Sequence, residues 1–141
     1  MQAEITDQPS QADVRVLITG LERSPSPVER QARDLGIFLK DEGEIIAGLY
    51  GHSYWNWLYV KYLWVAEEHQ QQGLGMKLMG MAEEEAIKRG CAGVHLNTYS
   101  FQAVDFYRKL GYTIFGEIQD HPRGETRYYL LKQFPPDITS P

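Results

Sequence analysis

A glycine turn in the middle of the chain joins an apolar run to an amphipathic segment. Residues 58–65 have the length and composition of a strand, residues 73–89 repeat apolar side chains at helical spacing, and Gly73 and Gly75 stand at the join. The first backbone amides of a helix have no partner inside the helix and lie at the positive end of its dipole, so a phosphate can bind there. The pattern predicts an anion-binding turn, although an ordinary strand-to-helix connection has the same composition.

A second helix signal follows the next predicted strand. Ser100 is a suitable N-cap, Gly111 is a suitable helix stop, and Arg108 and Lys109 occupy the last turn, where cations favour the helix dipole. Residues 100–111 are therefore predicted to form one short helix.

Together the two segments resemble the GCN5-related N-acetyltransferase (GNAT) family. The family pattern Gln/Arg-x-x-Gly-x-Gly/Ala is matched by Gln70-x-x-Gly73-x-Gly75. The pattern Ala-x-x-Phe/Leu-Tyr-x-x-x-Gly-Phe/Tyr is matched by Ala103-x-x-Phe106-Tyr107-x-x-x-Gly111-Tyr112. The resemblance covers residues 43–132, with one departure: Ser100 stands where many members carry Asn.

The resemblance and the order of the segments predict an α/β fold in one acetyltransferase domain, residues 1–134, with a frayed tail over 135–141. We expect a mixed, mostly antiparallel sheet of about six to seven strands, with a splayed central strand pair and flanking helices. The expected strands are residues 13–19, 37–40, 44–50, 56–65, 93–98, 112–118 and 126–132. A helix of about two turns is expected around residues 28–35, and the face of the long helix that carries Leu78, Met79, Ala82 and Ala86 is expected to be core.

Composition and charge limit the classes of partner that we expect for this chain. A net charge of −5 argues against nucleic acid, and the chain has neither an N-terminal apolar leader nor an apolar span of membrane length, so we expect a cytoplasmic protein without a membrane partner. The single cysteine, Cys91, is expected to be a core residue and not a nucleophile. The four histidines show no ligand spacing, which predicts no metal site.

The resemblance implies acetyl-CoA as cofactor and transfer of the acetyl group to a primary amine of a small molecule or peptide, by direct attack in a ternary complex. Tyr107 matches the family's general acid, and the backbone N–H of Val65 matches the group that binds the thioester carbonyl. A thiol has a reference pKa near ~8.5 and a phenol near ~10, so this donation is modestly uphill. The positions implied to bind the cofactor are Leu63, Trp64, Val65, Gln70, Gln71, Gln72, Gly73, Leu74, Gly75, Met76, Lys77, Asn97, Ser100, Ala103, Phe106 and Tyr107.

The general base is not evident in the sequence. Several family members carry a carboxylate on the strand before the glycine turn, but residues 57–63 contain no acid and Tyr59 is the nearest match. Our hypothesis is an ordered water that relays the proton to Tyr59 or to a residue such as His52.

Aromatic residues are concentrated next to this position. Seven of the seventeen aromatics lie between residues 50 and 64. This cluster, with Trp55, Trp57 and the neighbouring His52, can form part of the core, a wall for the acceptor amine, or a contact with a second subunit in a homodimer.

Two other classes of function fit parts of this pattern less well than an acetyltransferase does. The same fold can act as a non-catalytic acyl-CoA-binding sensor, but the presence of Tyr107 argues against that role. A nucleotide-binding module would need a phosphate-loop or dinucleotide-binding glycine pattern, and the chain has neither.

Overall fold

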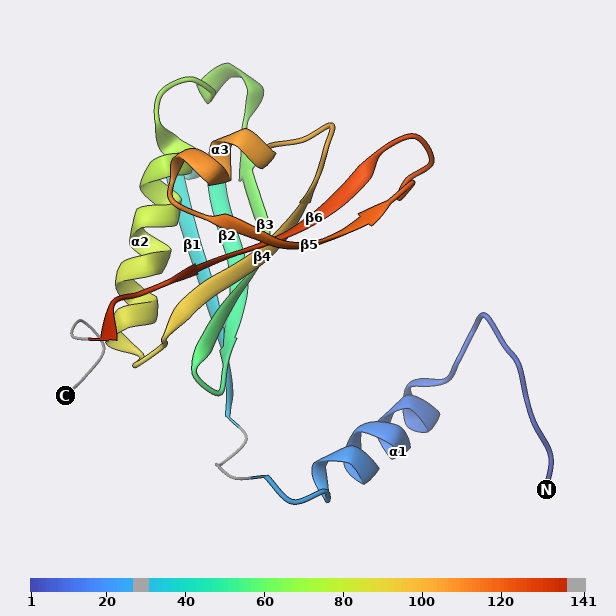
Figure 1. Cartoon of the computed structure of the whole chain (residues 1–141). Helices are drawn as coiled ribbons and strands as arrows, with labels where there is room; N and C mark the ends of the chain where they lie inside the picture. Colours follow the sequence, from blue (N-terminus) through green and yellow to red (C-terminus); the bar gives the residue numbers. More distant parts are fainter. Residues whose placement is uncertain (27–30, 137–141) are drawn as a thin grey trace.

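The computed structural model describes residues 1–26 and 31–136 of the chain (Figure 1). Its helices are α1 (Gln11–Glu22), the 3-10 turn η1 (Glu67–His69), α2 (Leu74–Lys88) and α3 (Val104–Lys109). Its strands are β1 (Ala32–Asp41), β2 (Glu44–Tyr54), β3 (Trp57–Val65), β4 (Gly93–Tyr99), β5 (Thr113–Gln119) and β6 (Thr126–Gln133). This is the α/β class that the sequence predicts.

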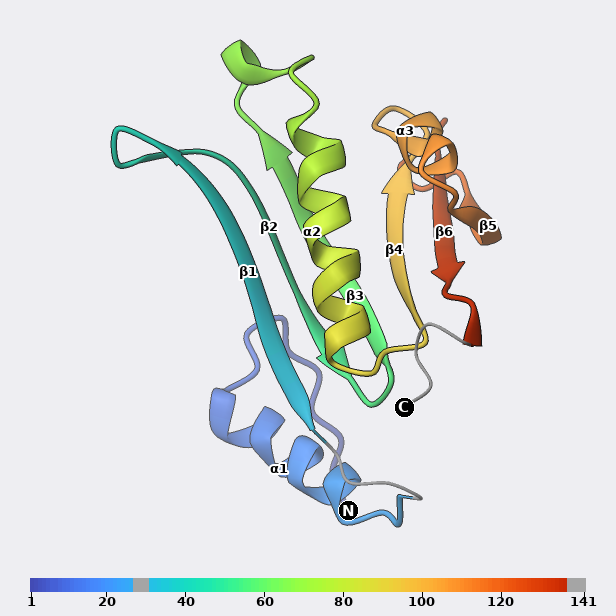
Figure 2. The same cartoon turned by 90° about the vertical axis from the view of Figure 1, so that its left-hand side faces the viewer.

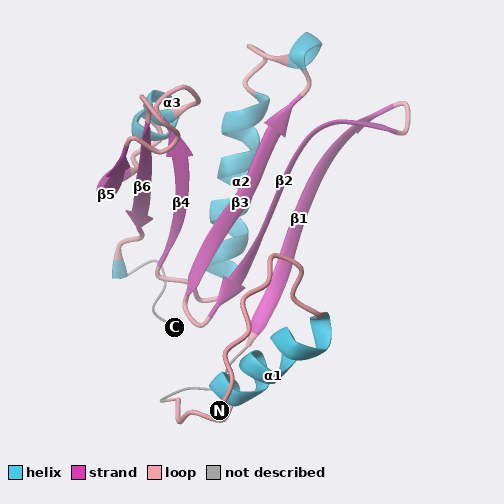
Figure 3. Ribbon diagram, turned by 90° about the vertical axis from the view of Figure 1, so that its right-hand side faces the viewer, coloured by secondary structure: helices cyan, strands magenta, loops and turns pink. Residues whose placement is uncertain are grey.

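The six strands of the described chain form one sheet in the order β1-β2-β3-β4-β6-β5. Every neighbouring pair is antiparallel except β3 and β4, which are parallel and are joined by the crossover helix α2. This central pair is short, running only from Trp57 opposite Gly93 to Tyr59 opposite His95. Beyond it the two strands diverge, as Figures 2 and 3 show, so the expected splayed central pair is confirmed.

The core lies between α2 and one face of the sheet. Leu78, Met79, Ala82 and Ala86 are buried on α2, as predicted. They pack with buried strand residues that include Leu49, Leu58, Val60, Val94, Leu96 and Leu130. Cys91 is also fully buried in this core, and burial raises the pKa of its thiol, in agreement with a structural role.

The end of α2 is fixed to the edge of the sheet by Arg89. Its guanidinium pairs with Glu85 at 2.9 Å and donates to Ser53 Oγ at 3.1 Å. It also donates to the backbone carbonyls of Arg33 and Asp34, each at 3.0 Å. One side chain thereby joins α2 to both β1 and β2.

The strand predicted at residues 13–19 is wrong, because this segment lies inside α1. Val14, Val16 and Ile18 alternate as in a strand, but Val14, Leu17, Ile18 and Leu21 also form a stripe at helical spacing. Ser10 decides in favour of the helix by accepting a hydrogen bond from the Asp13 N–H at 3.1 Å, as an N-cap does.

Helix α1 lies away from the rest of the molecule, beyond the first residues of β1 (Figures 1 and 3). None of its residues is buried. The stripe of Val14, Leu17, Ile18 and Leu21 is therefore exposed to solvent in the single chain.

The helix predicted around residues 28–35 is wrong where it can be assessed. Residues 32–35 belong to β1, whose pairing with β2 extends from Ala32 opposite Tyr54. Residues 28–30 of that prediction, and residues 137–141 of the predicted tail, lie outside the described residues.

The remaining strands and turns agree with the sequence. The hairpin around Glu42 and Gly43 is confirmed, and so are the strands at residues 56–65, 93–98, 112–118 and 126–132. The pairing of β2 with β3 is interrupted between Tyr50 and Gly51, which leaves Lys61 as an extra residue on β3 and forms a β-bulge. No helix in the described part of the chain is long and apolar enough to cross a membrane.

Two glycines give a direct test of the packing. A Cβ on Gly51 would lie 2.1 Å from the Tyr59 carbonyl oxygen, whereas a Cβ on Gly80, on the exposed face of α2, meets nothing within 4 Å. Gly51→Ala should lower the free energy of unfolding by about 1–3 kcal/mol through overpacking. Gly80→Ala should raise it by about 0.5–1 kcal/mol through helix propensity. Urea unfolding of both variants checks this, and equal effects would contradict the described contact at Gly51.

Candidate functional site

The site is built around the divergence of β3 and β4. Because the two strands separate after Tyr59 and His95, their facing backbone edges are no longer used by each other. The space between them leads to two cavities that share Leu63, Ala103 and Tyr107.

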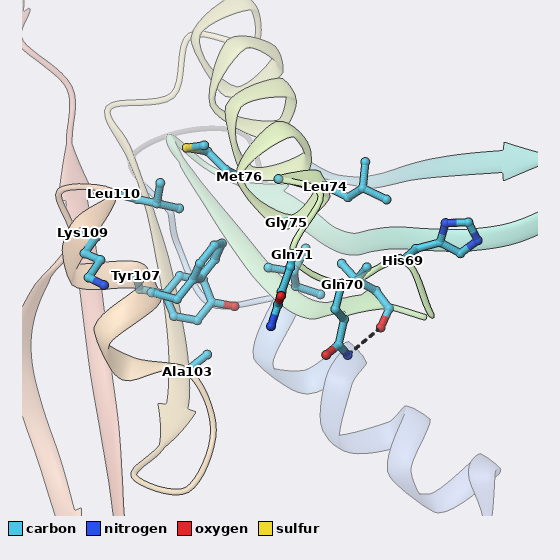
Figure 4. A pocket seen from close by; sticks show the side chains of 14 residues that line it. His69, Gln70, Gln71, Leu74, Gly75, Met76, Ala103, Tyr107, Lys109 and Leu110 are labelled. Atoms are coloured by element: carbon cyan, nitrogen blue, oxygen red, sulfur yellow. Dashed lines mark hydrogen bonds between the residues drawn. The ribbon is translucent and has the colours of Figure 1, made fainter. Parts of the chain in front are cut away.

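The first cavity, which we name the loop cavity, lies between the end of β3, the start of α2 and helix α3 (Figure 4). Its volume is about 580 Å³. It is lined by Leu63, Val65, His69, Gln70, Gln71, Gly73, Leu74, Gly75, Met76, Ala103, Phe106, Tyr107, Lys109 and Leu110. The two motifs found in the sequence therefore form opposite walls of one cavity.

The glycine turn has the backbone that an anion site needs. Gly73 precedes α2 with φ of 76°, a conformation that glycine adopts at low cost. The first turn of α2 contains no acidic side chain, and the backbone amides of a first turn have no partner within the helix. Gln70 closes the turn by donating from Nε2 to the Val65 carbonyl oxygen at 3.2 Å, the bond drawn in Figure 4.

Gly75 also allows the two walls to approach each other. A Cβ at this position would lie 3.2 Å from the ring of Phe106, which is closer than most such contacts. The second glycine of the motif therefore serves the packing of α2 against α3.

Tyr107 is the buried polar side chain at the meeting point of the two cavities. Its ring packs edge-on against Phe106 and Tyr112, at centroid distances of 5.1 and 6.0 Å. Burial raises the pKa of Tyr107 to about 12, so its hydroxyl is protonated at neutral pH.

A hydrogen-bonded group holds the end of α3 in place behind Tyr107. The Tyr112 hydroxyl donates to Glu83 at 2.9 Å, and Lys132 donates both to Glu83 at 2.9 Å and to the Leu110 carbonyl oxygen at 3.0 Å. Burial and the Glu83 carboxylate raise the pKa of Tyr112, which keeps it protonated as the donor. These bonds join α2, the end of α3 and β6.

The second cavity, the gap cavity, opens between the diverging strands and has a volume of about 430 Å³. It is lined by Lys61, Tyr62, Leu63, Trp64, Asn97, Thr98, Gln102, Ala103 and Tyr107. Its polar groups come mainly from β4 and the loop that follows it.

Asn97 connects this cavity to Tyr59. The Asn97 side chain donates from Nδ2 to the Tyr59 hydroxyl oxygen at 3.2 Å. Its Oδ1 accepts from Nε and Nη2 of Arg127, at 3.2 and 2.9 Å. A guanidinium only donates, so Arg127 fixes the amide with its NH₂ group toward Tyr59.

A third cavity, the aromatic cavity, lies on the sheet and has a volume of about 400 Å³. It is lined by His52, Tyr54, Trp55, Asn56, Trp57, Tyr59 and His95. His52, Tyr59 and His95 are direct neighbours across three strands, with centroid distances of 5.6 and 5.1 Å on either side of Tyr59. Burial, with a smaller effect of His52, holds the pKa of His95 below its ordinary value.

The structure separates some predicted site residues from these cavities. Trp64 and Asn97 line the gap cavity and not the loop cavity, while Gln72 and Lys77 line neither. Ser100 also lines neither: its Oγ hydrogen-bonds Glu125 and accepts from the Thr126 N–H at 2.9 Å.

The prediction that Ser100 caps the short helix is wrong. Helix α3 begins at Val104 after Ala103, without a side-chain cap, because residues 100–103 form a turn. In that turn Gln102 Oε1 accepts from the Tyr99 N–H at 3.3 Å. Ser100 instead joins the end of β4 to the start of β6.

Sequence reasoning missed His69, Lys109 and Leu110 in the loop cavity. Leu110 had a signal, because Ala103, Phe106, Tyr107 and Leu110 repeat at the spacing of one helix face. No sequence signal indicated that His95 lies beside Tyr59, because this position depends on the register of two parallel strands that are distant in sequence.

Comparison with known proteins shows which family the chain is similar to. The family model described as the acetyltransferase (GNAT) family matches residues 7–112. Blasticidin-S acetyltransferase of Streptomyces morookaense is 38% identical over 124 residues, which cover 79% of this chain and 90% of that protein. An acetyltransferase of Agrobacterium fabrum is 39% identical over 107 residues, covering 75% and 78% respectively.

Solved structures show the same arrangement. The crystal structure of an acetyltransferase from Bacillus cereus matches with a TM-score of 0.78 and 27% identity, covering 93% of this chain and 98% of that one. The family match covers most of the chain, and the chain also has the split sheet and both sequence motifs. The chain belongs to the acetyltransferase (GNAT) family and is an N-acetyltransferase that uses acetyl-CoA.

Proposed function

We propose that this enzyme transfers the acetyl group to a primary amine of a small molecule or peptide, by direct attack in a ternary complex. The observation that carries the proposal is the position of Tyr107, which lines both the loop cavity and the gap cavity. A cofactor in the first and an amine in the second would meet beside its hydroxyl.

The loop cavity has the shape and chemistry that a coenzyme A moiety needs. Its wall of Leu63, Val65 and Phe106 suits the pantetheine arm, and the backbone amides at the start of α2 suit the pyrophosphate. Gln70 and Gln71, which line this cavity, would add side-chain donors at the turn. When bound, acetyl-CoA supplies an acetyl group activated as a thioester.

The backbone of β3 offers donors toward the gap. Ala66 donates its N–H to the Ile46 carbonyl oxygen of β2 at 2.8 Å. Successive N–H groups of a strand point to opposite sides, so those of Val65 and Leu63 point away from β2 and toward β4. We assign the Val65 N–H to the thioester carbonyl, where it would stabilise the developing oxyanion.

Tyr107 would act on the leaving sulfur. With a pKa of about 12, complete proton transfer to a thiolate with a reference pKa near 8.5 is uphill by roughly 5 kcal/mol. Tyr107 therefore contributes mainly as a hydrogen-bond donor while negative charge grows on the sulfur. Its proton moves to the sulfur only as the amine nitrogen gives up a proton.

The acceptor would enter from the aromatic side of the sheet. His52, Trp55 and Trp57 line the aromatic cavity with no carboxylate among its described residues, and aromatic faces attract an ammonium group. The relative from Streptomyces morookaense is named for blasticidin S, which makes this antibiotic the first acceptor to test.

The first prediction concerns binding. Acetyl-CoA at about 100 times its dissociation constant should stabilise the protein by roughly 2.7 kcal/mol, measured as a rise in melting temperature. ATP and NAD serve as controls and should give no rise. A rise with ATP or NAD alone would contradict the proposed use of the glycine turn.

The second prediction concerns turnover. Tyr107→Phe should lower kcat for thiol release by about 10²- to 10⁴-fold without a change in acetyl-CoA affinity. Tyr128→Phe, a half-buried tyrosine on β6 outside the three cavities, is the matched control. Binding of acetyl-CoA without turnover of any amine by the wild-type protein would instead favour the non-catalytic sensor.

We also propose a homodimer, supported by the exposed stripe on α1. An isolated helix of 12 residues is marginal in water unless its apolar face is covered. A second copy of the chain can supply that cover.

The double change Leu17→Ser and Leu21→Ser should therefore convert a dimer into a species of the chain mass, 16.2 kDa, in size-exclusion chromatography with light scattering. Val16→Ser, on the opposite side of α1, is the control and should remain dimeric. A wild-type protein of the chain mass would overturn the dimer.

A further inference from the structure

We propose that His95 accepts, through Tyr59, the proton that the acceptor amine must lose before it attacks. This inference rests on the proposed function and adds to it the base that the sequence does not reveal. It starts from the absence of an acid where several relatives carry a carboxylate: residues 57–63 have none, and the described lining of the aromatic cavity has none either.

A hydrogen bond connects the lining of the gap cavity to Tyr59, the ring neighbour of His95. Asn97 lines the gap cavity beside Tyr107, and its amide donates to the Tyr59 hydroxyl oxygen at 3.2 Å. The phenol oxygen accepts this bond, so the Tyr59 O–H still has its own hydrogen to donate. Arg127 holds Asn97 in the orientation that this requires.

His95 is the imidazole best placed to complete the path. It is the residue directly opposite Tyr59 in the last pair before β3 and β4 diverge, and the two rings are 5.1 Å apart. His52 is also next to Tyr59, at 5.6 Å, but it lies on β2, one strand further from the gap. Within the described residues, no side-chain hydrogen bond occupies the ring nitrogens of His95.

The surroundings keep His95 neutral. The groups that face it are Trp57 and Tyr59 from β3, His52 from β2, Asn97 from its own strand and Leu131 from β6. Arg127, a cation on the neighbouring strand β6, is bonded to Asn97. Burial and His52 both lower the pKa of His95, so it is an unprotonated imidazole at neutral pH.

The proton balance is complete with these residues. An ammonium acceptor gives one proton to Tyr59. The rings of Tyr59 and His95 are neighbours without a direct hydrogen bond, so Tyr59 would pass its own proton to His95 through a bridging water, and His95 would release it to solvent. As the N–C bond forms and the C–S bond breaks, the sulfur gains a proton from Tyr107, and the second proton of the nitrogen restores the Tyr107 hydroxyl. The net products are the amide, the free thiol and one proton.

Three histidine variants test the assignment with blasticidin S and spermidine as acceptors. His95→Gln should lower kcat/KM at neutral pH by about 10²-fold or more, and the loss should shrink as pH rises because more of the amine is already neutral. His52→Gln should have a smaller effect. His121→Gln, in the turn between β5 and β6, is the matched control and should have none. An unchanged kcat/KM and pH profile for His95→Gln would overturn the inference.

A second readout does not depend on turnover. The imidazole of His95, followed by NMR, should titrate below the ordinary value of about 6.5, and Tyr59→Phe should shift that titration. A His95 that titrates at or above the ordinary value, unmoved by Tyr59→Phe, would also overturn the inference. If the wild-type protein acetylates neither amine, the proposed acceptor class fails while this titration still decides the role of His95. Unchanged acetyl-CoA stabilisation of each variant shows that it is folded.

Discussion

The early end of the pairing between β3 and β4 is the constraint on which the site depends. Three residue pairs join the two halves of the sheet, and α2 packs across them so that the core remains continuous. Beyond Tyr59 and His95 the backbone edges of both strands are available to other groups. In most sheets such unpaired edges are a liability, but here they border the cavities that meet at Tyr107.

Stable packing behind the gap gives the site its fixed geometry. The Tyr112, Glu83 and Lys132 group connects α2 to β6 and to the end of α3, so the short helix that carries Tyr107 is held from two sides. A helix of six residues has little stability of its own. The position of its tyrosine is therefore a property of the tertiary structure.

Much of the region around the loop cavity could be predicted because its signals are local. Gly73, Gly75 and the apolar face of α2 follow from turn chemistry and helical spacing, and residues 103–112 match a family pattern. The predicted N-cap at Ser100 was wrong because a serine that can cap a helix can equally bind a neighbouring strand, here at Thr126. The strand predicted over residues 13–19 was wrong because its three alternating valine and isoleucine positions, at residues 14–18, fit both a strand and a helix. The link from Asn97 through Tyr59 to His95 could not be predicted, since it depends on pairing between distant strands.

Amide chemical shifts on addition of coenzyme A test the central assignment, that the split between β3 and β4 holds the cofactor. We expect the largest shifts at residues 63–65 and 73–76 and around Tyr107, with the spectra of β1 and β5 nearly unchanged. Shifts confined to residues 52–59, or no shifts at saturating coenzyme A, would contradict the account.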